Sequence, residues 1–124
     1  MKKFTIFTIL VISFNAFADL KLSLDKDIDA LMKKVIEWRH DIHQNPELGN
    51  REFRTAKKIE DHLRSLGIKV ETNIAYTGVV GMLEGDLPGP TMALRADMDA
   101  LPVEEKTGLP FASKVRTTYL GNDV

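Results

Sequence analysis

Hydrophobic positions divide the chain into a helical first half and a second half with strand-like patterns. Apolar side chains recur at intervals of three and four over residues 28–42, the spacing of one face of an amphipathic helix. Ser23 and Asp25 are candidate caps for its start. We expect Asn45 and Pro46 to end it, because the residue before a proline is pushed out of the helical region.

A second helix is expected over residues 51–66, where Gly67 stands at the usual terminating position. The pattern then changes to alternation over residues 68–73, which predicts a strand with one wet face. Residues 77–83 and 91–96 predict two further strands. Two helices followed by three strands are compatible with the α/β or the α+β class, and we assign α/β.

The first residues carry the features of an export signal. Lys2 and Lys3 precede an apolar run over 4–14, and a small-x-small cleavage pattern ends at Ala18. We therefore expect residues 1–18 to be a signal peptide and residues 19–124 to be exported, as a periplasmic or secreted product. No later apolar run approaches the roughly 20 residues that span a bilayer, so no membrane association is expected after cleavage.

Charge and cysteine content exclude several classes of function. The signal peptide carries two lysines and no acid, so its removal makes the chain more acidic than its formal net charge of −1. A nucleic-acid partner is therefore not expected, because such proteins carry a basic patch. The chain has no cysteine, which excludes disulfides, a cysteine zinc site and a thiol nucleophile.

Two carboxylates are the main candidates for chemistry. Asp97 and Asp99 follow the third predicted strand, at the kind of sheet edge where ligands bind in open α/β folds. Strand geometry would point both to the same side. Such a pair can hold a metal, orient a ligating histidine, or share a proton as a metal-free acid/base pair. A solvated loop is the alternative interpretation.

Other polar clusters favour structural interpretations. His40 and His43 lie three apart on the first helix and are in principle able to share a metal. Two ligands do not make a zinc site, so we interpret them as helix-end residues that interact with terminal carbonyls. Glu104 and Glu105 are interpreted as part of a charged, solvated loop.

Four segments together resemble a known family: residues 39–49 (RHDIHQNPELG), 77–81 (TGVVG), 94–102 (LRADMDALP) and 105–111 (EKTGLPF). They are similar to the zinc-dependent aminoacylase/carboxypeptidase superfamily, in the branch of hippurate hydrolase and indoleacetyl-amino-acid hydrolase. The resemblance implies a metal-binding α/β catalytic domain interrupted by a smaller lid or dimerisation domain.

The resemblance also implies an activity and site residues. Family members cleave the amide bond of N-acyl amino acids or small peptides with two divalent metal ions, zinc or manganese. Asp99 occupies the position of the family's catalytic-site aspartate, which steadies a metal ligand. Asp97 occupies the position where other branches place a metal-binding histidine, and it is the candidate metal ligand.

Key parts of the family pattern are absent from the sequence. A His-Ala-Cys-Gly-His-Asp type block is expected after a segment like 114–124, and the later Glu-Glu pair is also missing. We therefore expect an amino-terminal fragment of the catalytic domain, from a premature stop, a frameshift or a split gene. Such a fragment would be inactive alone, would not bind the two metals, and would depend on a downstream complementary polypeptide. The alternative is a non-catalytic periplasmic binding or interaction remnant.

Overall fold

The computed structural model describes the backbone of residues 2–124 and the side chains of residues 21–124. The chain forms two bodies, Met1–His40 and Asp41–Val124. The predicted signal peptide, residues 1–18, lies outside the residues whose side chains are described.

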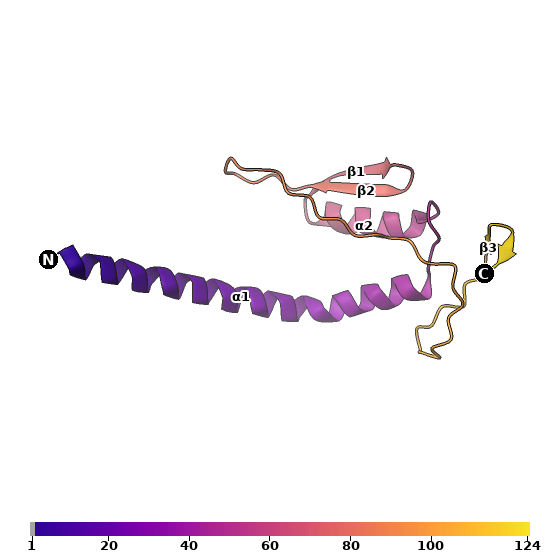
Figure 1. Ribbon diagram of the computed structural model, residues 1–124, viewed down its shortest axis with the longest axis horizontal. Helices are drawn as coiled ribbons and strands as arrows, with labels where there is room; N and C mark the ends of the chain where they lie inside the picture. Colours follow the sequence, from indigo (N-terminus) through magenta and orange to yellow (C-terminus); the bar gives the residue numbers. More distant parts are fainter. Residues whose placement is uncertain (1) are drawn as a thin grey trace. The chain divides into compact units, whose positions relative to one another are not determined.

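Helix α1 spans Lys2–Gln44 (Figure 1). The predicted start at Ser23 or Asp25 was wrong, because the helix runs through both, and residues 2–44 contain no glycine or proline to interrupt it. The predicted end was confirmed: the backbone N–H and side-chain amide of Asn45 both donate to the Asp41 carbonyl, at 3.1 and 2.9 Å. Among the described residues, no helix combines the length and apolar character needed to cross a membrane.

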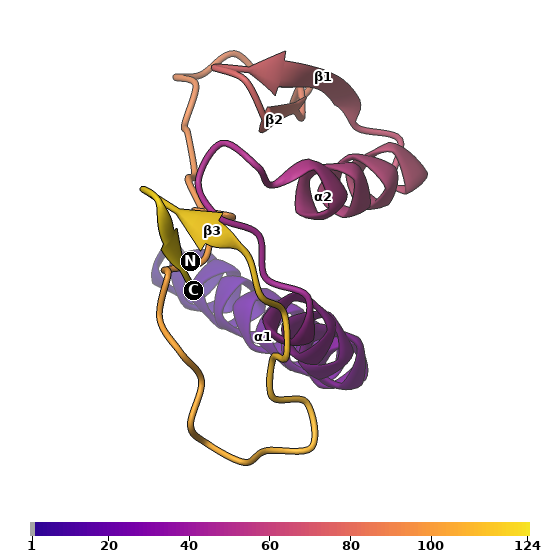
Figure 2. The ribbon, with the colours of Figure 1, turned by 90° about the vertical axis from the view of Figure 1, so that its right-hand side faces the viewer.

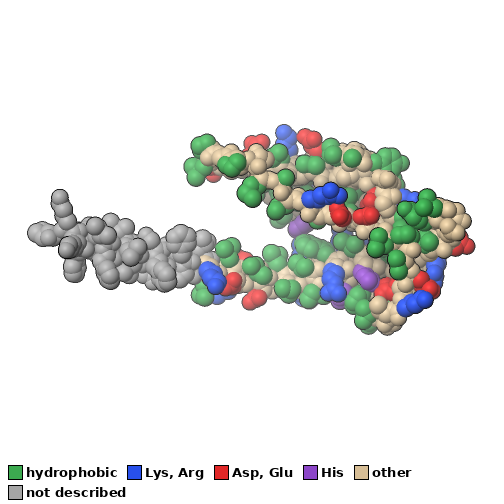
Figure 3. Space-filling view, viewed as in Figure 1, with side chains coloured by type: hydrophobic (Ala, Val, Ile, Leu, Met, Phe, Trp, Pro, Cys, Tyr) green, Lys and Arg blue, Asp and Glu red, His purple; other side chains and the backbone are tan. Residues whose placement is uncertain are grey.

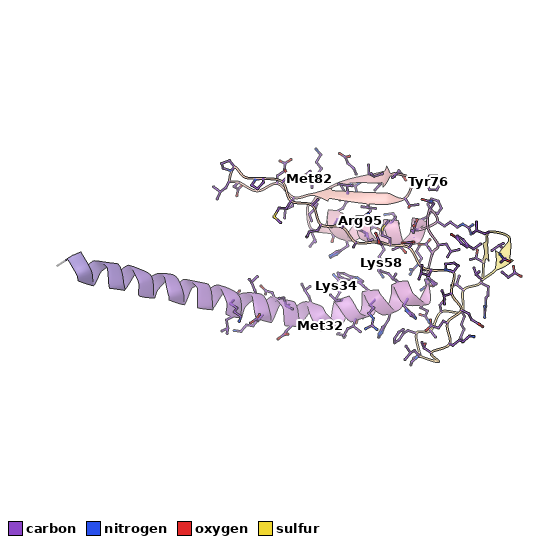
Figure 4. The ribbon with its side chains drawn as sticks, in the orientation of Figure 1. Met32, Lys34, Lys58, Tyr76, Met82 and Arg95 are labelled. Carbon is purple, nitrogen blue, oxygen red and sulfur yellow. The ribbon has the colours of Figure 1, made fainter. Side chains whose placement is uncertain are left out.

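The first body presents a half-exposed apolar stripe on α1, which includes Met32 (Figure 4). The Lys34 ammonium lies 5.0 Å from the Trp38 ring centroid, a cation–π contact along the helix.

Helix α2 spans Phe53–Ser65, within two residues of the prediction at its start. Gly67 ends it as predicted, with φ +76°. The Gly67 N–H donates to the Arg64 carbonyl at 3.0 Å and the Ile68 N–H to the Leu63 carbonyl at 3.2 Å. These two bonds form a Schellman motif, which favours glycine because of the positive φ.

A β-hairpin packs on α2 in the second body (Figures 1 and 2). It consists of antiparallel β1 (Lys69–Ile74) and β2 (Gly78–Met82), which confirms two of the predicted strands. Gly81 allows this packing, since a Cβ there would lie 3.2 Å from a methyl of Leu63 on α2. Tyr76 lies at the hairpin turn with φ +98° and contacts Phe53 edge-on, at 6.1 Å between ring centroids.

The third predicted strand, residues 91–96, is not formed. Its backbone has no hydrogen-bond partner among the described backbone groups, and Met92 and Leu94 are 85% and 97% exposed. A strand requires a neighbour to accept its hydrogen bonds, and none of the described residues provides one.

The remaining chain is mostly loop, as expected for residues 97–124. The sequence missed a short hairpin of β3 (Thr118–Tyr119) and β4 (Asn122–Asp123). Among described residues only Leu48 and Val70 are buried apolar side chains, whereas Glu52, Thr55 and Thr77 are buried polar ones. The α/β class is confirmed as a mixture of helices and short antiparallel strands around a small core.

Candidate functional site

The segment that links α1 to α2 brings the sequence motifs together. The Ala100 N–H donates to the Glu47 carbonyl at 2.8 Å, and Leu48 and Ala100 form an isolated parallel bridge. This pairing places the Asp97–Asp99 motif beside the Pro46–Gly49 motif, although about 50 residues separate them in sequence.

Asp97 and Asp99 have different neighbours. Asp97 pairs with Arg95, with its Oδ1 at 2.9 Å from Nη2 and 3.0 Å from Nε, and its side chain is 68% exposed. Asp99 is exposed next to Gly49, where a Cβ would lie 3.6 Å from the Asp99 carboxylate. The strand geometry that would align the two carboxylates is absent here, so their paired role stays a prediction.

His43 connects the end of α1 to a later loop. Its Nε2 lies 2.7 Å from Glu105 Oε2, and its ring meets Phe111 edge-on at 5.5 Å between centroids. We expected His43 to interact with the carbonyls at the helix end, but its ring contacts the Glu105 carboxylate instead. Glu105 also accepts from the Thr107 hydroxyl and the Ser113 N–H, and these bonds, with His43, lower the Glu105 pKa.

The solvated-loop interpretation therefore holds for Glu104 but not for Glu105. Glu104 is exposed and pairs at 3.5 Å with Lys106 and Arg116, whereas the side chain of Glu105 is only 13% exposed.

Two carboxylates organise the start of α2. Glu47 accepts from the backbone N–H groups of Arg54 and Thr55, at 3.0 and 2.7 Å, and from the Thr55 hydroxyl at 2.8 Å. It thereby satisfies two of the free amides of the first turn and places a negative charge at the positive end of the helix. The N-cap residue itself, Glu52, makes no capping bond with its side chain.

Glu52 instead fixes α2 to the hairpin. It is buried and accepts from the Thr77 hydroxyl at 2.7 Å. Burial acts to raise the pKa of Glu52, but the bond from Thr77 and bonds from nearby backbone N–H groups outweigh it and lower the pKa.

Asp41 fixes the last turn of α1 to α2. Its two oxygens accept from Arg54 Nη2 at 2.6 Å and Lys58 Nζ at 2.5 Å. Hydrogen bonds from these two cations lower the Asp41 pKa. Lys58 and Arg95 are labelled in Figure 4.

These carboxylates were missed at the sequence level. The position of Glu47 shortly before a predicted helix is a weak signal for capping. The Glu52–Thr77 bond joins residues 25 apart, and no local pattern encodes it.

A metal centre needs several donor side chains in one place. Among residues 21–124, no three histidine, aspartate or glutamate side chains gather in a way that would hold a metal ion. Zinc takes three or four protein ligands, and a two-metal centre needs more. The described residues therefore do not fit a complete metal site by themselves.

Comparisons with known proteins identify the relatives of the chain. No protein-family model matches it. It is 50% identical over 93 residues to hippurate hydrolase from Campylobacter jejuni, covering 75% of this chain and 24% of that enzyme. It is 48% identical over 99 residues to thermostable carboxypeptidase 2 from Saccharolobus solfataricus, covering 79% and 25%.

A solved structure has a similar fold over part of the chain. The YXEP protein of Bacillus subtilis, described as a dinuclear metal-binding peptidase of the M20 family, matches with a TM-score of 0.65 and 43% identity. The match covers 70% of this chain and 25% of that protein. The chain spans about a quarter of the length of the curated relatives it matches. With sequence and fold in agreement, the chain belongs to the M20 family of amidohydrolases and peptidases, of whose members it represents a part.

Proposed function

We propose that this chain is the amino-terminal part of an exported, metal-dependent amidohydrolase that cleaves N-acyl amino acids or small peptides. The main support is 40 to 50% identity, over 88 to 100 residues, to proteins that include a hippurate hydrolase and a deacetylase.

The chain contributes scaffold and positioning rather than a complete active site. Asp99 is the proposed residue that steadies a metal ligand in the completed enzyme, and Asp97 is the candidate ligand beside it. Two divalent metals, zinc or manganese, would polarise the amide carbonyl and activate water there. The lack of a donor cluster within the described residues supports the proposal that the chain alone is inactive.

The test is an amino-acid release assay on purified residues 19–124 with hippurate and N-acetylcysteine, in zinc or manganese. We expect no release from the chain alone. We expect release when it is co-expressed with the part of C. jejuni hippurate hydrolase that follows the matched segment. Release by the chain alone would overturn the proposed inactivity. Tight substrate binding without any complementation would favour the non-catalytic binding module instead.

Export is tested separately, by amino-terminal sequencing of the product from the periplasm or the medium. A product that begins at Asp19 is expected. An intact Met1 terminus on a cytoplasmic product would contradict the signal-peptide assignment.

A further inference from the structure

Asp99 lies against one loop of the second body, residues 47–52. The Ala100 N–H donates to the Glu47 carbonyl at 2.8 Å, which holds the backbone next to Asp99. The side chain of Asp99 meets the loop at a different point, because a Cβ on Gly49 would lie 3.6 Å from Asp99 Oδ2. The backbone and the side chain at this position are therefore held by different parts of the loop.

The two ends of the loop are fixed by two different carboxylates. Glu47 accepts from the backbone N–H groups of Arg54 and Thr55, at 3.0 and 2.7 Å, and so attaches the first end to α2. Glu52 accepts from the Thr77 hydroxyl at 2.7 Å and so attaches the second end to the hairpin. Acidic side chains are visible on the surface of the second body in Figure 3, whereas Glu52 is only 7% exposed. Water competes little for a buried carboxylate, so its bonds restrain the backbone around it.

Glu52 also acts on Asn50, the residue that follows Gly49. Asn50 has a positive φ of +62°, which asparagine tolerates better than most residues but does not prefer. The backbone N–H of Asn50 is among the donors that interact with the Glu52 carboxylate. This interaction stabilises the turn that presents Gly49 to Asp99.

A shallow cavity opens beside the same loop. Its volume is about 440 Å³, and it is lined by Gly49, Asn50, Arg51 and Tyr76. Tyr76 lies at the hairpin turn (Figure 4), directly before the threonine that bonds to Glu52. Gly49 belongs both to the cavity wall and to the contact with Asp99, so a shift of the loop would change both.

We infer that Glu52 is a positioning residue: by fixing the turn at Asn50 it holds Gly49 against Asp99 and so sets the direction of the Asp99 side chain. Glu52 acts through the loop and not through a contact with substrate. The direction of Asp99 matters because of its role in the proposed function, on which this inference rests. The contact itself exists in the chain alone and is measured there.

The test is nuclear magnetic resonance on the purified chain, without metal or substrate. The nuclear Overhauser effect between the Hα protons of Gly49 and the Hβ protons of Asp99 is the contact signal. Glu52→Gln replaces one acceptor oxygen with a donor, and Thr77→Val removes the hydroxyl that donates to Glu52. Thr77→Ser keeps that hydroxyl. The matched control is Glu60→Gln, the same change at an α2 glutamate that pairs with an arginine of its own helix at 2.9 Å.

We expect the contact signal to be lost in Glu52→Gln and weakened in Thr77→Val. The Ala100 amide should exchange with solvent within about twofold of the wild-type rate in both, because Glu47 holds it independently. Thr77→Ser and Glu60→Gln should retain the contact signal. Rescue by serine assigns the effect to the hydroxyl bond, because neither change at position 77 alters the charge of Glu52.

Three results would overturn the positioning role: no contact signal in the wild-type chain, an unchanged signal in both Glu52→Gln and Thr77→Val, or loss of the signal together with faster amide exchange throughout α2. The last result would make Glu52 a general structural residue. If Glu52→Gln does not fold, Thr77→Val decides between the outcomes, and circular dichroism verifies its fold. A chain that shows the expected signals but never supports hydrolysis would refute the proposed function alone.

Discussion

Residues 41–82 and residues 83–124 are stabilised in contrasting ways. In the first region, Asp41, Glu47 and Glu52 each accept bonds that connect one element to the next. In the second region, long apolar side chains are open to solvent, and a few ties hold the chain, such as the bond from the Ala100 N–H to the Glu47 carbonyl. The contrast teaches that local helix and hairpin structure forms within this chain, whereas residues 91–96 have no backbone partner among the described residues and form no strand.

Acidification should have the largest effect on stability, because it protonates several carboxylates that accept hydrogen bonds. The pKa values of Asp41, Glu52 and Glu105 are lowered from ordinary values of 3.8 for the aspartate and 4.5 for the glutamates. A lowered folded-state pKa gives stability that is present above the ordinary value and is lost as pH falls through the lowered one. Urea unfolding of residues 19–124, followed by circular dichroism, should therefore show constant stability from pH 7 to about pH 5 and a decline below about pH 4.

The matched control is the double variant Asp41→Asn and Glu52→Gln, which should show a shallower decline. Trimethylamine N-oxide at one fixed concentration raises the stability of all samples into a measurable range. A wild-type stability that rises on acidification would contradict the assigned role of these carboxylates.

Glu47→Ala should be the most damaging single substitution in the first region. It removes the acceptor for the Arg54 and Thr55 amides and for the Thr55 hydroxyl, which is nearly fully buried. Loss of such a cap and its charge costs about 2–3 kcal/mol of unfolding free energy. The urea midpoint measures it, with Glu47→Gln as the control that keeps an acceptor oxygen and loses roughly half as much. Equal effects of the two variants would show that charge alone carries the contribution.

Thr77→Val tests the bond between α2 and the hairpin. The valine retains the shape of threonine but leaves the buried Glu52 carboxylate without its hydroxyl donor. We expect a loss of about 1–2 kcal/mol, because the partner is a buried charge. Thr77→Ser keeps the hydroxyl and should lose less. Nuclear magnetic resonance titration should show a higher Glu52 pKa in Thr77→Val, and an unchanged pKa would mean that this bond contributes little.

Sequence patterns predicted the parts of the fold that depend on neighbouring residues. The α2 boundaries and the Gly67 terminus follow from apolar spacing and from the left-handed conformation that glycine tolerates. Strands β1 and β2 follow from alternation, and their hairpin forms because the two are adjacent in sequence.

Most of the site contacts that the sequence did not predict join residues that are distant in sequence. The apolar pattern of 91–96 indicates a preference for strand. A strand forms only where its backbone groups find hydrogen-bond partners. The meeting of Leu48 with Ala100 and of His43 with Glu105 joins segments more than 50 residues apart. Motif resemblance grouped these segments as one family pattern, while their contacts emerged only in the fold.

His43→Ala should have a local effect on the second region. His43 shares Glu105 with the Ser113 N–H, which donates to the same carboxylate at 2.8 Å. Removing the ring loosens the loop over residues 102–113, so the Ser113 amide should exchange faster with solvent by about threefold to tenfold. Amides in the middle of α2 should not change and serve as the internal control. Faster exchange throughout α2 would instead indicate a global role for His43.

The smallest expected effect on stability comes from Asp99→Asn. Asp99 is exposed beside Gly49, so its substitution should change the unfolding free energy of the chain by less than about 0.5 kcal/mol. The same substitution in the complemented enzyme should abolish amide hydrolysis, because the proposed role of Asp99 is to steady a metal ligand that the complementary polypeptide supplies. The zinc content of the purified complemented enzyme should also fall with Asp99→Asn, because a residue that steadies a metal ligand affects metal retention as well as rate. Full activity with Asp99→Asn would remove Asp99 from the proposed site. Lost stability in the chain alone would make Asp99 a structural residue, as Asp41, Glu47 and Glu52 are.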